Sequence, residues 1–350
     1  MTSRHRWQAV LSRQKPDRVP TDYWATSEVT DRLKRELHCS DEWALWDKLQ
    51  IDRLVAVGPR YVGPDLGGND IWGVPHRTIE YADGAGLYSE VADNPMARFT
   101  TVEQVHAYPW PRIEWYDFAD LSKQADQVLK RGYPVHAGHY EPFLTYCQLR
   151  GLEQAFMDLA AAPEIIDAIL DHLFDFHYQL NSRIFETIAP GRIDITYVAE
   201  DLGTQESLLI SEAMVDRFLK PKMKKMIDLA HQFGITVFYH SDGAVRPLIE
   251  GLIAVGIEVL NPIQWRCKGM ERDGLKRDFG DRLVFHGGVD NQQTLPFGTP
   301  DDVRQEVIDN LRILGAGGGY ILAPCHNIQP ITPTENILAL YETAAREGRL

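Results

Sequence analysis

From about residue 117 onward the chain alternates between candidate strands and candidate helices, and this alternation constrains the fold more than any other feature. A strand, a helix and a further strand in succession require parallel strands with helical crossovers. About eight candidate strands predict an α/β fold, a closed (β/α)8 TIM barrel. A doubly wound open sheet is the alternative, but no Gly-x-Gly-x-x-Gly follows the first strand, which disfavours its dinucleotide-binding form. The predicted strands are 133–138, 193–199, 235–240, 257–262, 283–287 and 319–323, and the predicted helices are 117–131, 141–160, 163–188, 211–233, 245–255, 270–279, 300–314 and 333–347.

The part of the chain before this alternation does not show the regular succession of strands and helices. Residues 1–50 read as short amphipathic helices around a Pro-bounded extended piece, 18–24, which could reach into a central cavity. Residues 51–57 are a further strand candidate, and 78–81 with 87–91 predict an inserted hairpin. No linker-like tract interrupts the chain, so we expect one barrel domain, 1–350, with 1–50 as an N-terminal helical elaboration.

Net charge and cysteine use narrow the functional classes. A formal net charge of −14 argues against nonspecific binding to nucleic acid or to an anionic membrane. The four cysteines form no CxxC pair, and neither a signal peptide nor a membrane span is apparent, so a soluble, cytoplasmic protein is expected. The expected partner is a small-molecule substrate, and the oligomeric state stays open, with a homodimer as one option.

Two strand ends carry side chains that can bind metals. His240 and Asp242 follow an apolar strand two residues apart, so both point the same way and can converge on one metal ion or proton. Cys325 and His326 follow the strand 319–323 in the same manner. A buried core histidine, an Asp helix cap and a small buried thiol are the plainer alternatives. Together, however, His240 and Cys325 supply an imidazole and a thiolate, which favour zinc, with His326 as an alternative ligand to Cys325.

Other predicted strand ends add polar groups that would face the same barrel mouth. Glu200 and Asp201 are adjacent, so at most one of them faces the mouth, and we favour Glu200. Glu200, His286 and Asp290 are the candidate catalytic residues. The candidate substrate-binding residues are Tyr23, Trp24, Gln205, Asn261, Gln264 and His326, and the candidate metal ligands are His240, Asp242 and Cys325.

These motifs resemble those of the uroporphyrinogen decarboxylase superfamily, over nearly the whole chain. The resemblance rests on five stretches, which are 15–20, 200–205, 239–243, 285–290 and 317–327. It implies a (β/α)8 barrel with its site at the carboxyl ends of the strands. Uroporphyrinogen decarboxylases carry an N-terminal Arg-rich segment that holds substrate carboxylates, whereas here Val19-Pro20 is followed by Thr21-Asp22-Tyr23-Trp24. Tetrapyrrole decarboxylation is therefore not expected.

The methyltransferase-like branch of the superfamily looks more similar. It resembles this chain at a His-x-Cys-Gly turn and a late cysteine, which are zinc ligands in that branch; His240 and Cys325 match, but Asp242 replaces the first cysteine. A carboxylate leaves zinc a stronger Lewis acid, which suits an oxygen leaving group. We therefore expect a zinc-dependent methyltransferase that demethylates a small methoxylated or related methylated compound and passes the methyl group to a corrinoid (cobalamin) carrier on a partner protein. The alternatives are a metal-dependent lyase or decarboxylase acting on a small organic acid, and a noncatalytic binding protein.

Overall fold

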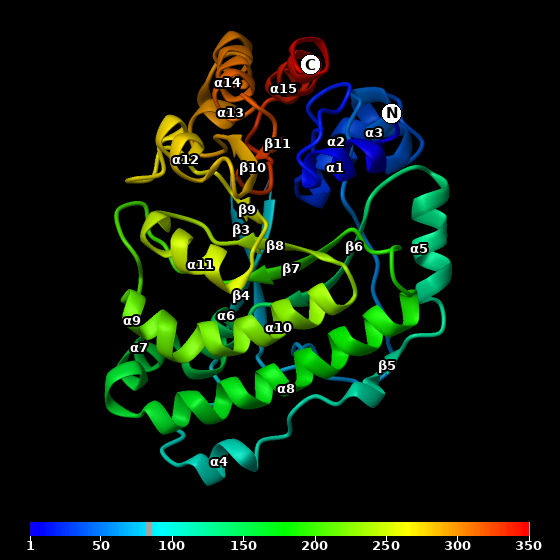
Figure 1. Ribbon diagram of the computed structural model, residues 1–350. Coiled ribbons are helices and arrows are strands. Elements are labelled where there is room, and N and C mark those ends of the chain that lie inside the picture. Colours follow the sequence, from blue (N-terminus) through cyan, green and yellow to red (C-terminus); the bar gives the residue numbers. More distant parts are fainter. Residues whose placement is uncertain (82–85, 350) are drawn as a thin grey trace.

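The computed structural model describes residues 1–81 and 86–349, and its centre is a curled parallel sheet (Figure 1). The seven strands run in the order β1-β6-β7-β8-β9-β10-β11, and every neighbouring pair is parallel. The expected α/β fold with parallel strands is confirmed. The strands of this sheet are β1 (Val55–Ala56), β6 (Val135–Tyr140), β7 (Ile195–Ala199), β8 (Thr236–His240), β9 (Val259–Asn261), β10 (Val284–Val289) and β11 (Tyr320–Pro324).

The extended N-terminal segment 20–24 fills the eighth strand position and closes the barrel. Thr21 forms a parallel bridge with Leu322 of β11, where the Leu322 amide donates to Pro20 O (3.0 Å) and the Asp22 amide donates to Leu322 O (2.9 Å). On its other side, Thr21 O accepts a hydrogen bond from the Asp52 amide (2.7 Å), just before β1. The segment therefore joins the two edges of the sheet, so that no edge is left open there.

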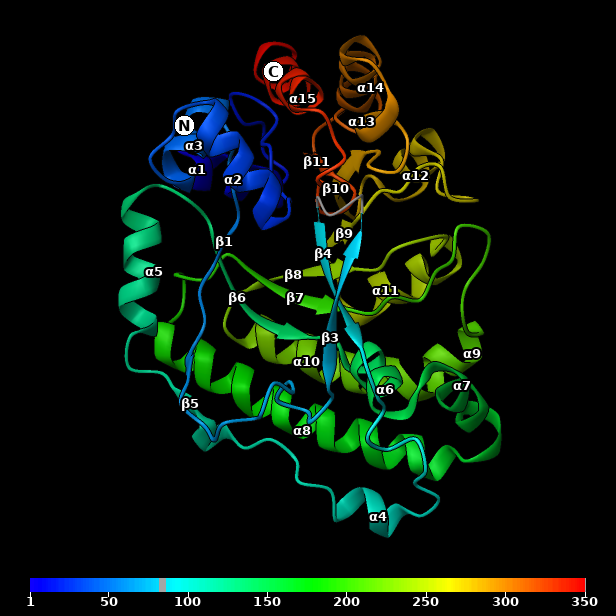
Figure 2. The same cartoon turned by 180° about the vertical axis from the view of Figure 1, so that it is seen from behind.

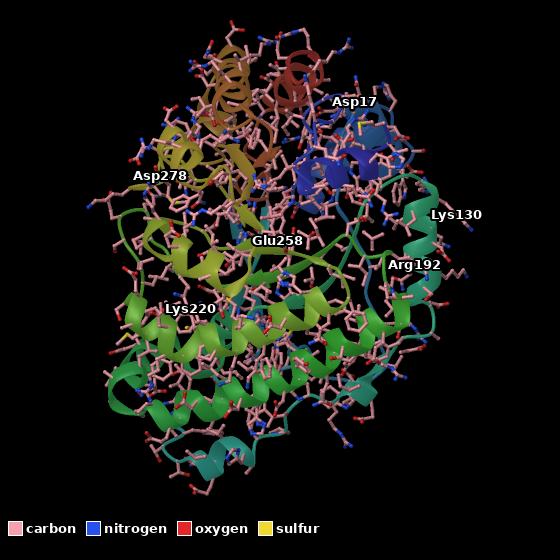
Figure 3. The ribbon with its side chains drawn as sticks, in the orientation of Figure 1. Asp17, Lys130, Arg192, Lys220, Glu258 and Asp278 are labelled. Carbon is pink, nitrogen blue, oxygen red and sulfur yellow. The ribbon has the colours of Figure 1, made fainter. Side chains whose placement is uncertain are left out.

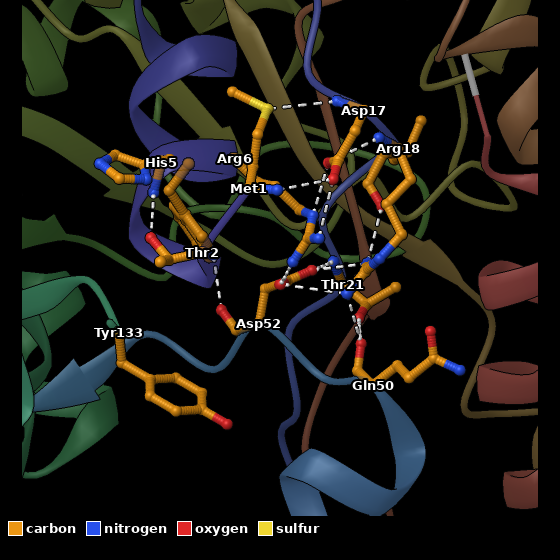
Figure 4. A network of polar contacts seen from close by, with 12 residues as sticks. Met1, Thr2, His5, Arg6, Asp17, Arg18, Thr21, Gln50, Asp52 and Tyr133 are labelled. Carbon is orange, nitrogen blue, oxygen red and sulfur yellow. Dashed lines mark hydrogen bonds and ion pairs between the residues drawn. The ribbon is translucent and has the colours of Figure 1, made fainter. Parts of the chain in front are cut away.

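A buried carboxylate fixes this closing segment to the N-terminal helices (Figure 4). Asp52 is fully buried and lies 2.6 Å from Arg18 Nη1 and 3.0 Å from Arg6 Nη1. Its Oδ2 also accepts a hydrogen bond from the Thr21 amide (3.1 Å). Because a buried charge requires paired donors, these contacts hold helix α1 (Ser3–Leu11) and the closing segment in one arrangement.

The helices cover the outside of the sheet, with the long α8 and α10 lying side by side below it in the view of Figure 1. The prediction 163–188 is confirmed by α8, whereas the predicted helix 141–160 is two helices that meet at Gly151, which has φ of +80°. The predicted helix 211–233 contains a π-helical segment, Val215–Leu219, between α9 and α10. The α-helices are α1 (Ser3–Leu11), α2 (Ser27–Glu36), α3 (Glu42–Leu49), α4 (Val102–His106), α5 (Leu121–Lys130), α6 (Pro142–Arg150), α7 (Leu152–Ala161), α8 (Pro163–Ile188), α9 (Glu212–Met214), α10 (Lys220–Gln232), α11 (Ile249–Val255), α12 (Arg272–Phe279), α13 (Thr294–Phe297), α14 (Pro300–Ile313) and α15 (Thr334–Glu347).

The predicted hairpin is confirmed by β3 (His76–Tyr81) and β4 (Gly86–Val91), which pair antiparallel. It stands near the tips of β6 and β7 in Figure 2, and the Tyr81 hydroxyl donates to Gln329 in the loop after β11. A second small pair joins β2 (Arg60–Tyr61) to β5 (Tyr116–Asp117). The hairpin thus reaches the end of the barrel where the strands terminate.

Some charged side chains, such as Lys130 of α5 and Lys220 of α10, lie on the outer surface of the helices (Figure 3). At the start of α10, Lys220 pairs with Asp216 and Lys222 Nζ lies 2.9 Å from Asp171 of α8. The lysine side chains of these pairs are partly covered and the aspartates are exposed, so each pair lies at the protein surface. Among the described residues, no helix combines the length and the apolar character that crossing a bilayer requires.

Candidate metal centre at the barrel mouth

The carboxyl ends of β7, β8 and β11 bring their polar residues to one end of the barrel. His240 is the last residue of β8, and Asp201, Asp242 and His326 follow the ends of their strands. Cys325 directly follows β11 at the same end, so the expected single mouth for His240 and Cys325 is confirmed. Parallel strands produce this result because all their carboxyl ends face one side.

Asp201, His240 and Asp242 form a group that could hold a metal ion. One ligand atom from each residue lies within 4.8 Å of the others, and all three residues are partly exposed. His240 Nε2 is 3.6 Å from Asp201 Oδ1, which also accepts a hydrogen bond from the Asp242 amide (3.1 Å). Asp242 Oδ1 is buried without a hydrogen-bond partner among the described residues, and burial raises the pKa of this carboxyl. A divalent cation would satisfy this oxygen, so the residues fit a metal.

The orientation of the two adjacent carboxylates is the reverse of the expectation, because Asp201 faces the mouth and Glu200 does not. The Glu200 side chain is fully buried, and its Oε2 accepts a hydrogen bond from the Phe143 amide at the start of α6 (3.0 Å). Burial raises the pKa of Glu200 well above its usual range, which favours the neutral acid. Alternation along the extended chain separates the two residues, and only the register decided which one faces inward.

The structure does not bring the Cys325 thiol into this group. The side chain is buried, and Sγ donates to Ile263 O at 3.3 Å. Burial raises the pKa of the thiol well above its usual range, which disfavours the thiolate that binds zinc. The ligand atoms that do come together are one imidazole nitrogen and carboxylate oxygens, a set that selects zinc less sharply than a thiolate would.

Behind His240, a chain of hydrogen-bonded side chains crosses the barrel interior. His240 Nδ1 lies 2.6 Å from Asn261 Oδ1, and Asn261 Nδ2 lies 2.7 Å from His286 Nδ1. His286 Nε2 in turn lies 3.2 Å from Asp22 Oδ2. Asn261, His286 and Asp22 are all fully buried. His286 was expected to be catalytic and Asn261 to bind substrate. Instead, their side chains are hydrogen-bonded to each other in the barrel interior, below the mouth.

Asp22 and Trp24 point into the barrel from the closing segment. Trp24 Nε1 donates to Asp22 Oδ2 (2.9 Å), and the indole lies 5.9 Å from the His240 ring and 5.7 Å from the His286 ring. Burial alone would raise the pKa of Asp22, but Arg53 and the hydrogen bond from His286 lower it to about 2. Asp22 is therefore a carboxylate, and Trp24 is an apolar wall beside the metal group.

Tyr23, which the sequence analysis grouped with Trp24, points the other way. Its side chain is buried, its hydroxyl lies 2.9 Å from Thr30 Oγ1, and its ring packs against Tyr341. Successive side chains in an extended segment face opposite sides, so Trp24 and Tyr23 cannot both line the barrel interior. The same alternation identifies Asp22 as an inward residue, and this signal in the sequence was overlooked.

Asp290 and Gln264 form hydrogen bonds that stabilise the loops around the site. Asp290 is buried, pairs with Arg266 Nε (2.6 Å) and accepts hydrogen bonds from backbone amides, including that of Thr294 (3.1 Å). These donors leave it no role as a free base. Gln264 Oε1 accepts a hydrogen bond from the Gly243 amide (2.6 Å) and so supports the turn that carries Asp242.

Gln205 and His326 are the two predicted substrate-binding residues that remain exposed at the rim. Gln205 Nε2 donates to Gln292 Oε1 (3.0 Å). His326 lies close enough to Asp242 to lower the pKa of that carboxyl, although burial outweighs it. Both side chains could reach a molecule in the mouth.

Comparison with known proteins agrees with this architecture. A family model described as Uroporphyrinogen decarboxylase (URO-D) matches residues 77–347. The uroporphyrinogen decarboxylases of Serratia proteamaculans (strain 568) and Pseudoalteromonas translucida (strain TAC 125) are 25% and 29% identical over 290 residues, which are 78% and 77% of this chain and 77% of each relative. A methyltransferase from Methanosarcina mazei shares the fold, with a TM-score of 0.71 at 18% identity and 99% of both chains covered. The resemblance expected from the motifs is confirmed, and the chain belongs to the uroporphyrinogen decarboxylase family.

Proposed function

We propose that this protein is a metal-dependent methyltransferase that removes a methyl group from a small methoxylated or related methylated compound and passes it to a corrinoid carrier held by a partner protein. The observation that carries the proposal is the Asp201, His240 and Asp242 group at the mouth, with Trp24 beside it. The full-length likeness to a protein described as a methyltransferase supports the choice of reaction class within the family.

The charge of the mouth argues against the tetrapyrrole decarboxylation that the names of the curated relatives describe. Asp201 and Asp242 place carboxylates at the opening, and the negative charge of Glu141 also raises the pKa of Asp242. From the closing segment, Asp22 adds a buried carboxylate whose charge is already paired with Arg53. Like charges repel, so the Asp201 and Asp242 carboxylates would disfavour a substrate with several carboxylates wherever a bound cation does not neutralise them.

Zinc is the first ion to test, and other divalent cations that accept nitrogen and oxygen ligands are the alternatives. A cation held by Asp201, His240 and Asp242 would act as a Lewis acid toward the oxygen that leaves during demethylation. Trp24 would hold the apolar part of the substrate against the site and exclude water from that side. His326 and Gln205 at the rim could donate hydrogen bonds that orient the polar part.

The proposal is tested by metal analysis combined with product analysis. We expect purified protein to carry about one divalent ion per chain and to convert a methoxylated small molecule plus a reduced corrinoid carrier into a demethylated product and a methylated carrier. His240→Ala should lose the ion and the activity, whereas Tyr23→Phe, which removes a hydroxyl bonded only within the outer layer, should retain both.

Two outcomes would contradict the proposal. Release of carbon dioxide or of a dehydrated product from an organic acid, without methyl transfer, would instead favour the metal-dependent lyase or decarboxylase. Full metal retention in His240→Ala would remove His240 from the ligand set and leave it a core histidine.

A further inference from the structure

We infer that Asp22 sets the tautomer of His240 through His286 and Asn261, so that Nε2 of His240 keeps its lone pair and presents it to Asp201 and Asp242. The inference deepens the proposed function, because it assigns three positioning residues to the metal ligand. It concerns where protons sit along a buried chain of hydrogen bonds, and that can be measured in the protein without metal.

With a neutral His286, the donors and acceptors among Asp22, His286, Asn261 and His240 allow one consistent arrangement. The Asp22 carboxylate can only accept, so His286 carries its proton on Nε2 and donates it. The Nδ1 of a neutral His286 is then an acceptor, which matches the Asn261 amide nitrogen that faces it. Asn261 is left to present its carbonyl oxygen to His240, so the proton of His240 must lie on Nδ1.

The neutral state of His286 supports this direction. Its pKa is lowered by burial, which outweighs the opposing effects of the hydrogen bond and the charge of Asp22. With a doubly protonated His286 the Asn261 amide would turn round and donate to His240, so the neutral ring is what gives the stated direction. All three residues behind His240 are fully buried, so solvent cannot supply alternative partners.

Asp22 is the residue that fixes the direction in which the hydrogen bonds from His286 to His240 are donated. The Asn261 amide can rotate and a neutral imidazole has two tautomers, so these three groups alone would be equally satisfied in reverse. The Oδ1 of Asp22 is held by the amides of Tyr23 (2.8 Å) and Leu54 (3.1 Å), which leaves Oδ2 toward His286. Because Asp22 Oδ2 can only accept, it determines which nitrogen carries the proton in His286 and, through Asn261, in His240.

The consequence for a cation is geometric. His240 Nε2 is the nitrogen that lies 3.6 Å from Asp201 Oδ1, and a proton on Nε2 would block coordination there. Partners of this kind behind a ligand histidine typically change metal affinity by about 10- to 100-fold when they are removed.

The test replaces Asp22 by its isosteric amide. In Asp22→Asn the two backbone amides of Tyr23 and Leu54 should outweigh the single Trp24 Nε1 donor and still select the side-chain oxygen at the Oδ1 position. The new NH2 group then faces His286 and reverses the direction of the hydrogen bonds. We expect nitrogen NMR of histidine-labelled, metal-free protein, recorded about two pH units above the ordinary histidine pKa of about 6.5, to show the His240 proton on Nδ1 in the natural protein and on Nε2 in the variant. Zinc affinity should fall about 10- to 100-fold.

Asp52→Asn is the matched control. It removes another buried carboxylate that holds the same closing segment, but Asp52 makes no hydrogen bond to the side chains of Asp22, His286, Asn261 or His240 among the described residues. This variant should keep the His240 tautomer and the zinc affinity of the natural protein. Asn261→Leu breaks the series of hydrogen bonds between His286 and His240, so in this variant the tautomer of His240 should become mixed. It tests the inference if Asp22→Asn does not fold.

The inference is overturned if His240 of the natural protein carries its proton on Nε2, or if Asp22→Asn and Asn261→Leu leave both tautomer and affinity unchanged. If the natural protein shows the expected tautomer but binds no divalent ion, the proposed function fails while the proton arrangement stands.

Discussion

A buried histidine provides a quantitative test of how the fold responds to pH. His177 of α8 is 9% exposed, and its ring lies 5.4 Å from that of Trp72 and 5.7 Å from that of Tyr140. Neither ring nitrogen has a hydrogen-bond partner among the described side chains and backbone atoms. Burial, and then the charge of His139, lowers the pKa of His177 from 6.5 to about 3.

The depressed pKa predicts a loss of stability as the pH falls. Below pH 6.5 the unfolded chain binds a proton at His177 that the folded protein does not, so unfolding is favoured until the folded pKa of about 3 is reached. At about 1.36 kcal/mol per pKa unit, the contribution at pH 5 is about 2 kcal/mol. His177→Leu removes the titrating group, so the variant should gain about 2 kcal/mol relative to the natural protein between pH 7.5 and pH 5.

The measurement is urea unfolding followed by tryptophan fluorescence at pH 7.5, 6 and 5, with the variant and the natural protein in parallel. Phe176→Leu, at the neighbouring buried position, is the control, because the loss of its contact with Trp72 should cost the same free energy at each pH. Parallel pH curves for His177→Leu and the natural protein would show that His177 titrates normally and would refute the reasoning.

Two further predictions concern the buried ion pair and the metal ligands. Asp158→Ala should destabilise the protein by about 3–5 kcal/mol, because it leaves the buried Arg150 guanidinium (Nε–Oδ2 2.7 Å) without its partner. Thermal unfolding measures this loss. As the control, Glu250→Ala breaks an exposed bidentate pair with Arg282 and should leave the melting temperature unchanged. Asp201→Asn should reduce bound metal and Cys325→Ser should retain it; the opposite result would restore the thiol to the ligand set.

The barrel class was predictable because the pattern that specifies it is local. Alternating apolar strands and amphipathic helices require parallel strands, and the carboxyl ends of parallel strands share one face. The common location of His240, Asp242 and Cys325 at the mouth followed from that rule alone. The long helix 163–188 was predictable for a similar reason, since its apolar residues recur at helical spacing over many turns.

The tertiary structure decided which of these side chains meet. Register, which depends on pairing with neighbouring strands, placed Asp201 in the mouth and Glu200 behind it. The burial of Cys325 against Ile263 depends on packing between distant segments, and no local pattern encodes it. The largest addition is Asp22, which reaches His286 across 264 positions of sequence because the N-terminal segment closes the barrel beside β11. The sequence by itself determined which chemical groups gather at one end of the barrel, whereas the contacts among them were decided by closure and packing, since those bring together residues that no short-range periodicity relates.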